Sequence, residues 1–144
     1  LHYLELRYPQ PALVPADIAQ RVRMQTFCQT IAADIQPLQN LGPLGYLTKE
    51  FGASEEQKSA WIRHWVERGL AALEQDFAAG VGDYVLGNKV TQADCLLVPQ
   101  VYNAERYACD TSKFPRLYEV ALRVRELPSF KQAHPSAQPD AVAG

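Results

Sequence analysis

Apolar residues recur every three or four positions in several stretches of the chain, which is the spacing of amphipathic helices. Residues 17–38 and 54–79 each carry one such apolar face, and a shorter face follows Pro115. Residues 91–107 are apolar on nearly every side, so this stretch must be surrounded by other helices. No stretch alternates convincingly as a strand does. The pattern predicts an all-α domain, a bundle of five or six helices.

The start of each long stretch carries a helix-capping pattern, in which an Asp, Ser or Thr side chain accepts a bond from a backbone N–H of the first turn. An acidic or amide residue three positions later can reach back to the cap. The pairs are Asp17 with Gln20, Ser54 with Gln57, and Thr91 with Asp94.

Proline interrupts two of these stretches. Pro37 is expected to kink the first helix, because proline lacks the N–H that the previous turn would use. Pro99 is expected to bend the helix at 91–107 for the same reason. Gly42 and Pro43 are expected to end the element after Pro37, with residues 44–52 an ambiguous connector.

Both ends of the chain differ from the middle. Residues 1–8 read as the end of a helix whose beginning lies in another domain, and 9–16 as a proline-rich linker. Residues 17–134 form the helical domain, and 135–144 are expected to be an exposed tail. The chain is therefore expected to be a piece of a longer protein.

Composition changes this picture little. An apolar fraction of 47%, a charged fraction of 21% and a net charge of −2 are ordinary for a globular domain and give no nucleic-acid or membrane footprint. No motif for a metal or a phosphate group is present, so no metal is expected. Three cysteines without metal spacing predict core thiols in a reducing cytoplasm.

Polar residues gather at two places in this apolar pattern. Gln36, Gln39 and Asn40 surround the Pro37 kink, and either they bind a ligand or they repair the kink by local hydrogen bonds. Arg106 ends the apolar stretch at 91–107 and is a candidate to bind a substrate anion. The alternative is that Arg106 caps the last carbonyls or pairs with a surface carboxylate.

Two motifs carry a resemblance to a known family. The stretch Gly-Asn-Lys-Val-Thr-Gln-Ala-Asp at 87–94 resembles the buried helix of glutathione transferases in general. Ile-Gln-Pro-Leu-Gln-Asn-Leu at 35–41 and Pro-Gln-Val-Tyr-Asn-Ala-Glu-Arg at 99–106 resemble the zeta class, the maleylacetoacetate isomerases. The resemblance covers essentially the whole chain and implies the C-terminal helical domain of such an enzyme.

The resemblance implies roles for particular residues. Glutathione, the expected cofactor, would contact Gln36, Asn40, Leu41 and Gly42, and Arg106 would bind the substrate carboxylate. Related maleylpyruvate isomerases carry arginine and histidine where this chain has Gly42 and Gln36, which favours maleylacetoacetate. No catalytic residue is expected here, since the family's Ser-Ser-Cys motif lies in an N-terminal thioredoxin-like domain that this sequence lacks.

The activity implied is glutathione-dependent cis-trans isomerisation of maleylacetoacetate to fumarylacetoacetate in aromatic amino-acid catabolism, with transferase side activity. A homodimer, a small carboxylate substrate, and no nucleic-acid or membrane partner are expected. The chain alone would be inactive. The alternatives are a maleylpyruvate isomerase, a general glutathione transferase, or a non-catalytic interaction or dimerisation module.

Overall fold

The fold of the chain is all-α, as the sequence predicts. A computed structural model describes residues 1–141, and within that range β-structure is limited to isolated bridges at 81–87. Short 3-10 turns cover Ala78–Gly80, Thr111–Lys113 and Pro135–Ala137. The main elements are α1 (His2–Arg7), α2 (Ile18–Gln29), the π-helix η1 (Thr30–Ile35), α3 (Gln36–Leu38), α4 (Leu41–Phe51), α5 (Glu55–Phe77), α6 (Gln92–Arg106), α7 (Pro115–Val124) and α8 (Pro128–Ala133).

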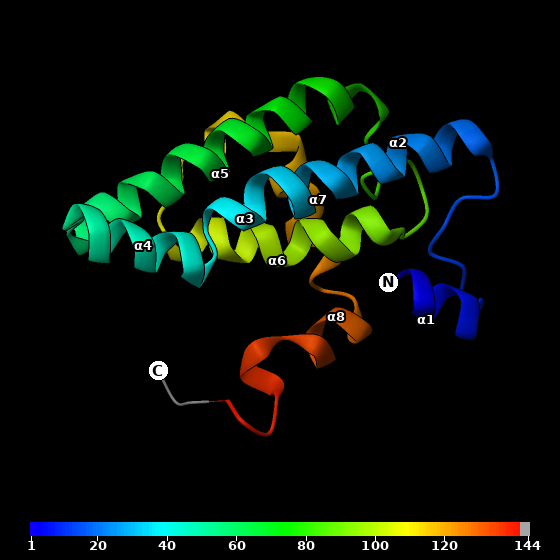
Figure 1. The fold of residues 1–144 in the computed structure, drawn as a ribbon. Helices are drawn as coiled ribbons and strands as arrows, with labels where there is room; N and C mark the ends of the chain where they lie inside the picture. The colour runs from blue at the N-terminus through cyan, green and yellow to red at the C-terminus, as the bar shows by residue number, and fades with distance from the viewer. Residues whose placement is uncertain (142–144) are drawn as a thin grey trace.

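The long helices run side by side around α6 (Figure 1). The continuous run of α2, η1 and α3 lies between α5 and α6, with α7 behind α6. Helix α4 closes one end of the bundle, while α1 and α8 both lie on the outer side of α6. Fully buried side chains from each long helix meet in one core, among them Phe27, Ile31, Leu70, Leu97 and Leu117. The expectation that residues 91–107 form a central buried helix is confirmed.

The capping patterns place the helix starts as predicted. Asp17 accepts from Gln20 N at 2.8 Å, and both Ser54 and Thr91 form reciprocal capping boxes. Asp94 does more than cap, because it is fully buried and also accepts from Val85 N at 2.9 Å. It thereby anchors the extended segment before α6 as well as the start of the helix.

Gly69 allows α5 to approach the π-helix closely. A β-carbon at this position would lie 2.4 Å from Cγ1 of Ile35, which is itself buried. Because Gly69 has no side chain, Ile35 packs directly against α5. This contact positions Ile35, the residue from which α3 begins.

Helix α4 corrects the prediction for residues 42–52. Gly42 and Pro43 do not end an element but lie in the first turn of a new helix, where proline is tolerated because its N–H would be unpaired. Asn40 caps this helix through Leu41 N at 2.9 Å, and Gly52 ends it in the left-handed conformation. The glycines and proline in the sequence concealed a capped helix.

The break at Pro37 takes the form of a wider helix. Residues Thr30–Ile35 form a π-helix, in which Gln36 N donates to the carbonyl of Ile31, five residues earlier. The helix resumes as α3 with Pro37 in its first turn. This widened turn directs Gln36, Gln39 and Asn40 toward α6.

The connector between α1 and α2 is held by hydrogen bonds. The Glu5 carboxylate accepts from Leu13 N at 3.2 Å and from Val14 N at 3.1 Å, and the Leu13 carbonyl accepts from Gln92 N at 3.0 Å. Residues 9–16 are therefore fastened to both α1 and α6. Residues 131–141 are exposed, and the final part of the predicted tail, 142–144, lies outside the described residues. In residues 1–141 no helix combines the length and apolarity needed to cross a bilayer.

Candidate functional site

A polar pocket of about 380 Å³ lies where α3 and the start of α4 face the middle of α6. Its walls are side-chain amides together with one proline and one aromatic ring. These residues are Gln36, Gln39, Asn40, Pro99, Gln100, Tyr102 and Asn103. Because an amide both donates and accepts hydrogen bonds, the pocket suits a ligand with peptide or carboxylate groups.

A chain of three amides joins the two sides of this pocket. Asn103 Nδ2 donates to Gln39 Oε1, and Gln39 Nε2 donates to Gln100 Oε1 at 2.8 Å. Gln39 therefore bonds across to α6 and does not repair the Pro37 kink locally. The chain holds α3 at a fixed position against α6.

Two of the expected glutathione contacts, Gln36 and Asn40, lie in the pocket beside this chain. The side chain of Gln36 is half-buried and makes no hydrogen bond within residues 1–141. The Asn40 oxygen is engaged by Leu41 N, so its amide N–H groups are the part left for a ligand. Both residues therefore present hydrogen-bonding groups to a bound molecule.

The backbone beneath these residues is braced by α5. Trp61 Nε1 donates to the carbonyl of Leu38 at 2.7 Å, within the short helix α3. Ile35, one residue before Gln36, is pressed against Gly69. The site is thus built on a packed bundle end and not on a free loop.

The other expected contacts lie farther out. Leu41 is 85% exposed, and Gly42 has open space where a β-carbon would be. Arg106 is exposed in the last turn of α6, with its guanidinium carbon 5.7 Å from the centre of the Tyr107 ring. It lines neither the polar pocket nor the larger cleft, but it follows Asn103 by three residues and so lies on the same helix face.

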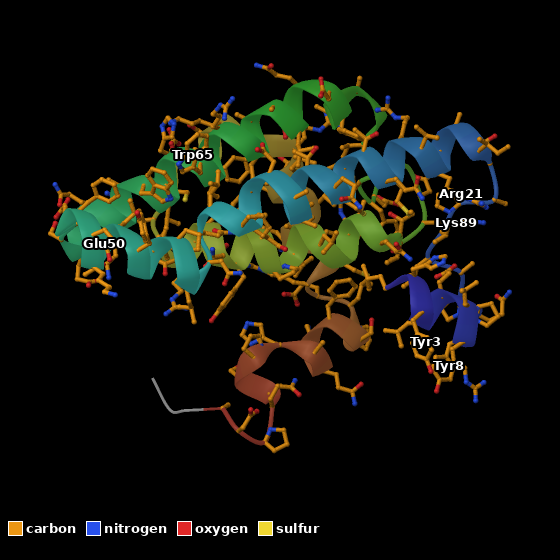
Figure 2. All side chains as sticks on the ribbon, viewed as in Figure 1. Tyr3, Tyr8, Arg21, Glu50, Trp65 and Lys89 are labelled. Carbon is orange, nitrogen blue, oxygen red and sulfur yellow. The ribbon has the colours of Figure 1, made fainter. Side chains whose placement is uncertain are left out.

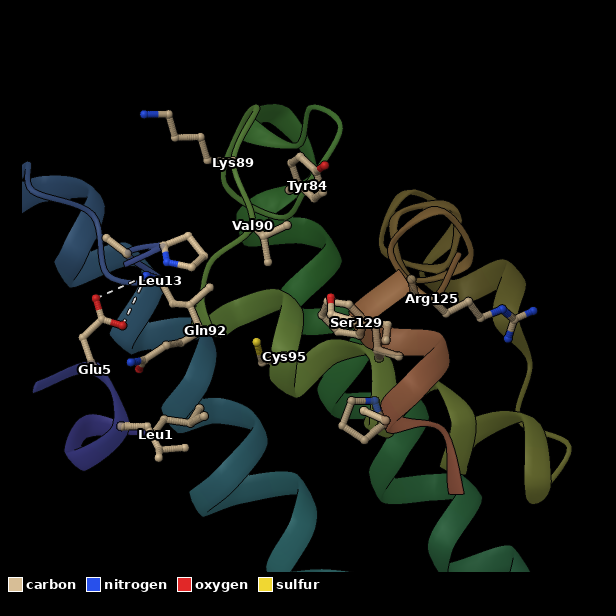
Figure 3. Close-up of a pocket in the computed structure, with 18 of the residues that line it drawn as sticks. Leu1, Glu5, Leu13, Tyr84, Lys89, Val90, Gln92, Cys95, Arg125 and Ser129 are labelled. Atoms are coloured by element: carbon tan, nitrogen blue, oxygen red, sulfur yellow. Dashed lines mark hydrogen bonds between the residues drawn. The ribbon is translucent and has the colours of Figure 1, made fainter. Parts of the chain in front are cut away.

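A larger apolar cleft of about 950 Å³ adjoins the polar pocket. Figure 3 shows Glu5 and Leu13 on one side of it, Ser129 and Arg125 on the other, and Cys95 between them. Pro99 and Tyr102 line both spaces, so these two residues form their shared wall on α6. Polar and apolar binding surfaces therefore meet along one helix.

The Arg125 guanidinium, which lines the apolar cleft, is paired with a carboxylate. Arg125 Nη1 contacts both oxygens of Glu105 at 3.0 Å, and Tyr118 donates to the same carboxylate at 3.0 Å. Burial and then the neighbouring Asp94 carboxylate raise the pKa of the Cys95 thiol. A protonated thiol is a weak nucleophile. Cys95 lies half-buried in the cleft wall, whereas Cys28 and Cys109 are the thiols that lie in the core.

Gln100 and Asn103 are site residues to which the sequence assigned no role, and for Gln39 it left ligand binding and repair of the kink open. Their signal was present, since Gln100 and Asn103 are polar residues inside an otherwise apolar helix. Their pairing could not be read, because Gln39 lies 61 positions from Gln100 and 64 from Asn103.

Comparison with known proteins gives a consistent picture. Residues 41–133 match the family described as "Glutathione S-transferase, C-terminal domain". A relative from Vibrio cholerae, named "Probable maleylacetoacetate isomerase", is 45% identical over 141 residues. The match covers 98% of this chain but 66%, just under two thirds, of that relative's length.

Solved structures share the whole described fold. The holo structure of a maleylpyruvate isomerase, a bacterial zeta-class protein, has a TM-score of 0.94 and 40% identity over 98% of this chain and 68% of its own. A maleylacetoacetate isomerase from Anaeromyxobacter dehalogenans, solved with dicarboxyethyl glutathione and citrate, has a TM-score of 0.92 and 38% identity. That match covers 99% of this chain and 65% of the solved one.

Proposed function

The chain belongs to the glutathione S-transferase family, and on that premise we propose that its full-length protein isomerises maleylacetoacetate to fumarylacetoacetate with glutathione as cofactor. The observation that carries the proposal is the polar pocket, in which Gln36 and Asn40 are left with free hydrogen-bonding groups. Relatives named as maleylacetoacetate isomerases support it.

The residues of the pocket fit glutathione chemically. Glutathione is a tripeptide with two carboxylates, and the amides of Gln36, Asn40 and Gln100 can donate to its oxygens. When bound, it supplies a thiol that adds reversibly to an activated double bond. The chain's own contribution is to orient that molecule by amide bonds and to keep water from its apolar side at Pro99 and Tyr102.

For Arg106 we propose a role in binding the substrate carboxylate from the rim of the cleft. A guanidinium offers paired donors with the geometry of a carboxylate. Arg106 is exposed and has Asn103 one turn earlier on α6, so it can reach a ligand that extends past the polar pocket. For Leu41 and Gly42, at the start of α4, we propose contacts with glutathione from outside.

Maleylpyruvate is the second candidate substrate, since a solved relative with that activity has a TM-score of 0.94 to this chain. Gln36 and Gly42 favour maleylacetoacetate, because the resemblance places histidine and arginine at these positions in maleylpyruvate isomerases.

The test is an isomerase assay of the full-length protein with each of the two substrates, with and without glutathione. We expect turnover of maleylacetoacetate that needs glutathione and exceeds turnover of maleylpyruvate. Glutathione-independent turnover contradicts the proposed role of glutathione. No turnover of either substrate contradicts the proposed activity and favours an interaction module.

We also propose a cytoplasmic location and a homodimer for the full-length protein. Three cysteines without disulfides support the reducing compartment. Sedimentation equilibrium at several protein concentrations tests the dimer, and a monomer throughout would contradict it.

A further inference from the structure

Gln100 is a buried amide whose nitrogen has no partner. The residue is 1% exposed on the inner face of α6, and its Oε1 accepts from Gln39. Its Nε2 is buried and makes no hydrogen bond within residues 1–141. A buried donor without an acceptor destabilises a fold, so its presence calls for a partner that this chain does not supply.

The direction of the amide chain explains which group is left over. Asn103 donates to Gln39 and Gln39 donates to Gln100, so each amide orients the next one. The oxygen of Gln100 is occupied, and its nitrogen is the end of the chain. All three residues line the polar pocket with Gln36 and Asn40.

Within the part of the chain that the structure describes, Gln100 differs from the other residue with a buried, unpaired side-chain nitrogen. Among residues 1–141, the one other buried side-chain nitrogen without a partner is Nε1 of Trp65, which lies on α5 (Figure 2). Trp65 lines neither the polar pocket nor the apolar cleft, so no ligand can be assigned to it. Gln100 combines an unpaired donor with a place in the pocket wall.

We propose that Gln100 Nε2 donates a hydrogen bond to an oxygen of the ligand in the polar pocket, and that Gln39 and Asn103 are positioning residues that hold Gln100 in this orientation. An amide nitrogen can only donate, so the ligand atom must be an acceptor, a carboxylate or peptide carbonyl oxygen. The inference rests on the proposed function, in which glutathione and a carboxylate substrate both carry such oxygens.

The test measures binding to the full-length protein by calorimetry. Glutathione is titrated in one experiment, and malonate, a small dicarboxylate that represents the substrate carboxylate, in another. Gln100→Glu keeps the shape and the oxygen that accepts from Gln39 but removes the donor. Gln100→Met removes the donor without adding charge. We expect both variants to weaken binding of the ligand that contacts Gln100 by about tenfold or more.

A matched control is Gln25→Glu, which makes the same change in charge on the exposed face of α2 and should bind both ligands as the unaltered protein does. If both Gln100 variants lose binding of glutathione alone, the acceptor of the Gln100 bond is an oxygen of glutathione. If they lose binding of malonate alone, the acceptor is a carboxylate of the substrate. If only Gln100→Glu loses binding, charge repulsion explains the result and the proposal is overturned.

The positioning role has its own variant. Gln39→Met cannot donate to Gln100 and adds no charge beside an anionic ligand, so it should weaken binding of the same ligand by several-fold. Unchanged binding by this variant overturns the positioning role. If both Gln100 variants bind as the unaltered protein does, the Gln100 contact is overturned and the proposed function stands. If the unaltered protein binds neither ligand, both the contact and the proposed function are overturned.

Discussion

At the scale of single residues, two buried side chains decide how the region around α6 is held together. Asp94 fixes the start of the helix and Gln100 fixes its middle, and each accepts a hydrogen bond from a segment outside α6. Burial raises the pKa of Asp94, and its hydrogen bonds from Val85 and Thr91 offset this only in part. Both side chains are buried polar groups, and the hydrogen bonds that they make are to other groups of the protein.

Asp94→Asn is expected to destabilise the domain by about 1–3 kcal/mol. Asp94 accepts from Val85 N with one oxygen and from Thr91 N with the other, and asparagine has a single acceptor oxygen. One backbone N–H would then face an N–H of the side chain. Urea unfolding measures the loss, with exposed Asp76→Asn as the control. Equal stability of both variants would contradict the anchoring role.

Arg106→Ala in the full-length protein is expected to lower kcat/KM for the carboxylate substrate by about ten- to a hundredfold, since a charge-assisted bond contributes about 1.5–3 kcal/mol. Arg106→Lys should recover part, because it keeps the charge and loses the planar donor pair. Gln36→Ala should instead raise the KM for glutathione. Steady-state kinetics with each ligand varied decides, with exposed Arg116→Ala as control. A loss within about twofold makes Arg106 a structural cation.

At the scale of helices, two contacts made by α5 hold the elements around the site. One is the close approach at Gly69, and the other is the Glu67 carboxylate. Helix α5 touches the π-helix at Gly69 and holds the loop after α6 through Glu67. Neither contact is part of the polar pocket. The contact at Gly69 positions the start of α3, and the bond from Asp110 N to Glu67 fixes the path of the chain after α6.

Gly69→Ala is expected to destabilise the bundle by about 1–2 kcal/mol, because overpacking against Ile35 outweighs the gain in helix propensity. In an Ile35→Ala background the same change should become neutral or stabilising. Thermal and urea melts of the double-mutant cycle give the coupling. Gly45→Ala is the control, since it lies in α4 with open space around it and should stabilise slightly. The absence of coupling would contradict the close crossing.

Glu67→Gln is expected to lower stability at neutral pH and to have little effect in acid. Burial acts to raise the pKa of Glu67, but hydrogen bonds from Lys113 and the Asp110 N–H outweigh it and hold the pKa below its usual value. A lowered pKa stabilises the fold above the unfolded value near 4.5, and this is lost as pH falls through the folded pKa. Urea melts across that pH range give the free energy of unfolding of the unaltered protein and of Glu67→Gln, and the two values should converge as the pH falls. Exposed Glu119→Gln is the control.

At the scale of the whole molecule, the bundle and its N-terminal helix are joined through bonds to the linker. The Glu5 carboxylate accepts hydrogen bonds from the backbone N–H groups of residues 13–14. The Leu13 carbonyl accepts one from Gln92 N at the start of α6. The proline-rich connector is thus part of the cleft wall (Figure 3).

Glu5→Gln is expected to loosen this connector, because an amide oxygen replaces a carboxylate that accepts both backbone bonds. Hydrogen exchange at Leu13 and Val14 should accelerate several-fold, and proteolysis within residues 9–16 should become faster. Glu56→Gln, exposed in the first turn of α5, is the control. Unchanged exchange at both amides would show that the clamp is not needed.

The sequence predicted what depends on local spacing and missed what depends on distant pairing. Caps at Asp17, Ser54 and Thr91 placed three helix starts, because a cap acts within its own turn. Helix α4 was missed because its glycines and proline have low helix propensity and its Asn40 cap was assigned to a ligand. The partners of Gln39 follow from the packing of α3 on α6, which no local pattern encodes.

The bond from Trp61 to Leu38 gives the chain an optical reporter of its own. The sequence has two tryptophans, and Trp61 places its indole nitrogen against the backbone of α3, beside the polar pocket. Trp65 lies 5.6 Å from it between ring centres and packs against His64 and Arg68, and the His64 imidazole can quench the emission of Trp65. Any ligand that shifts α3 changes the polarity around Trp61, so its fluorescence spectrum should register events in the pocket without an attached dye.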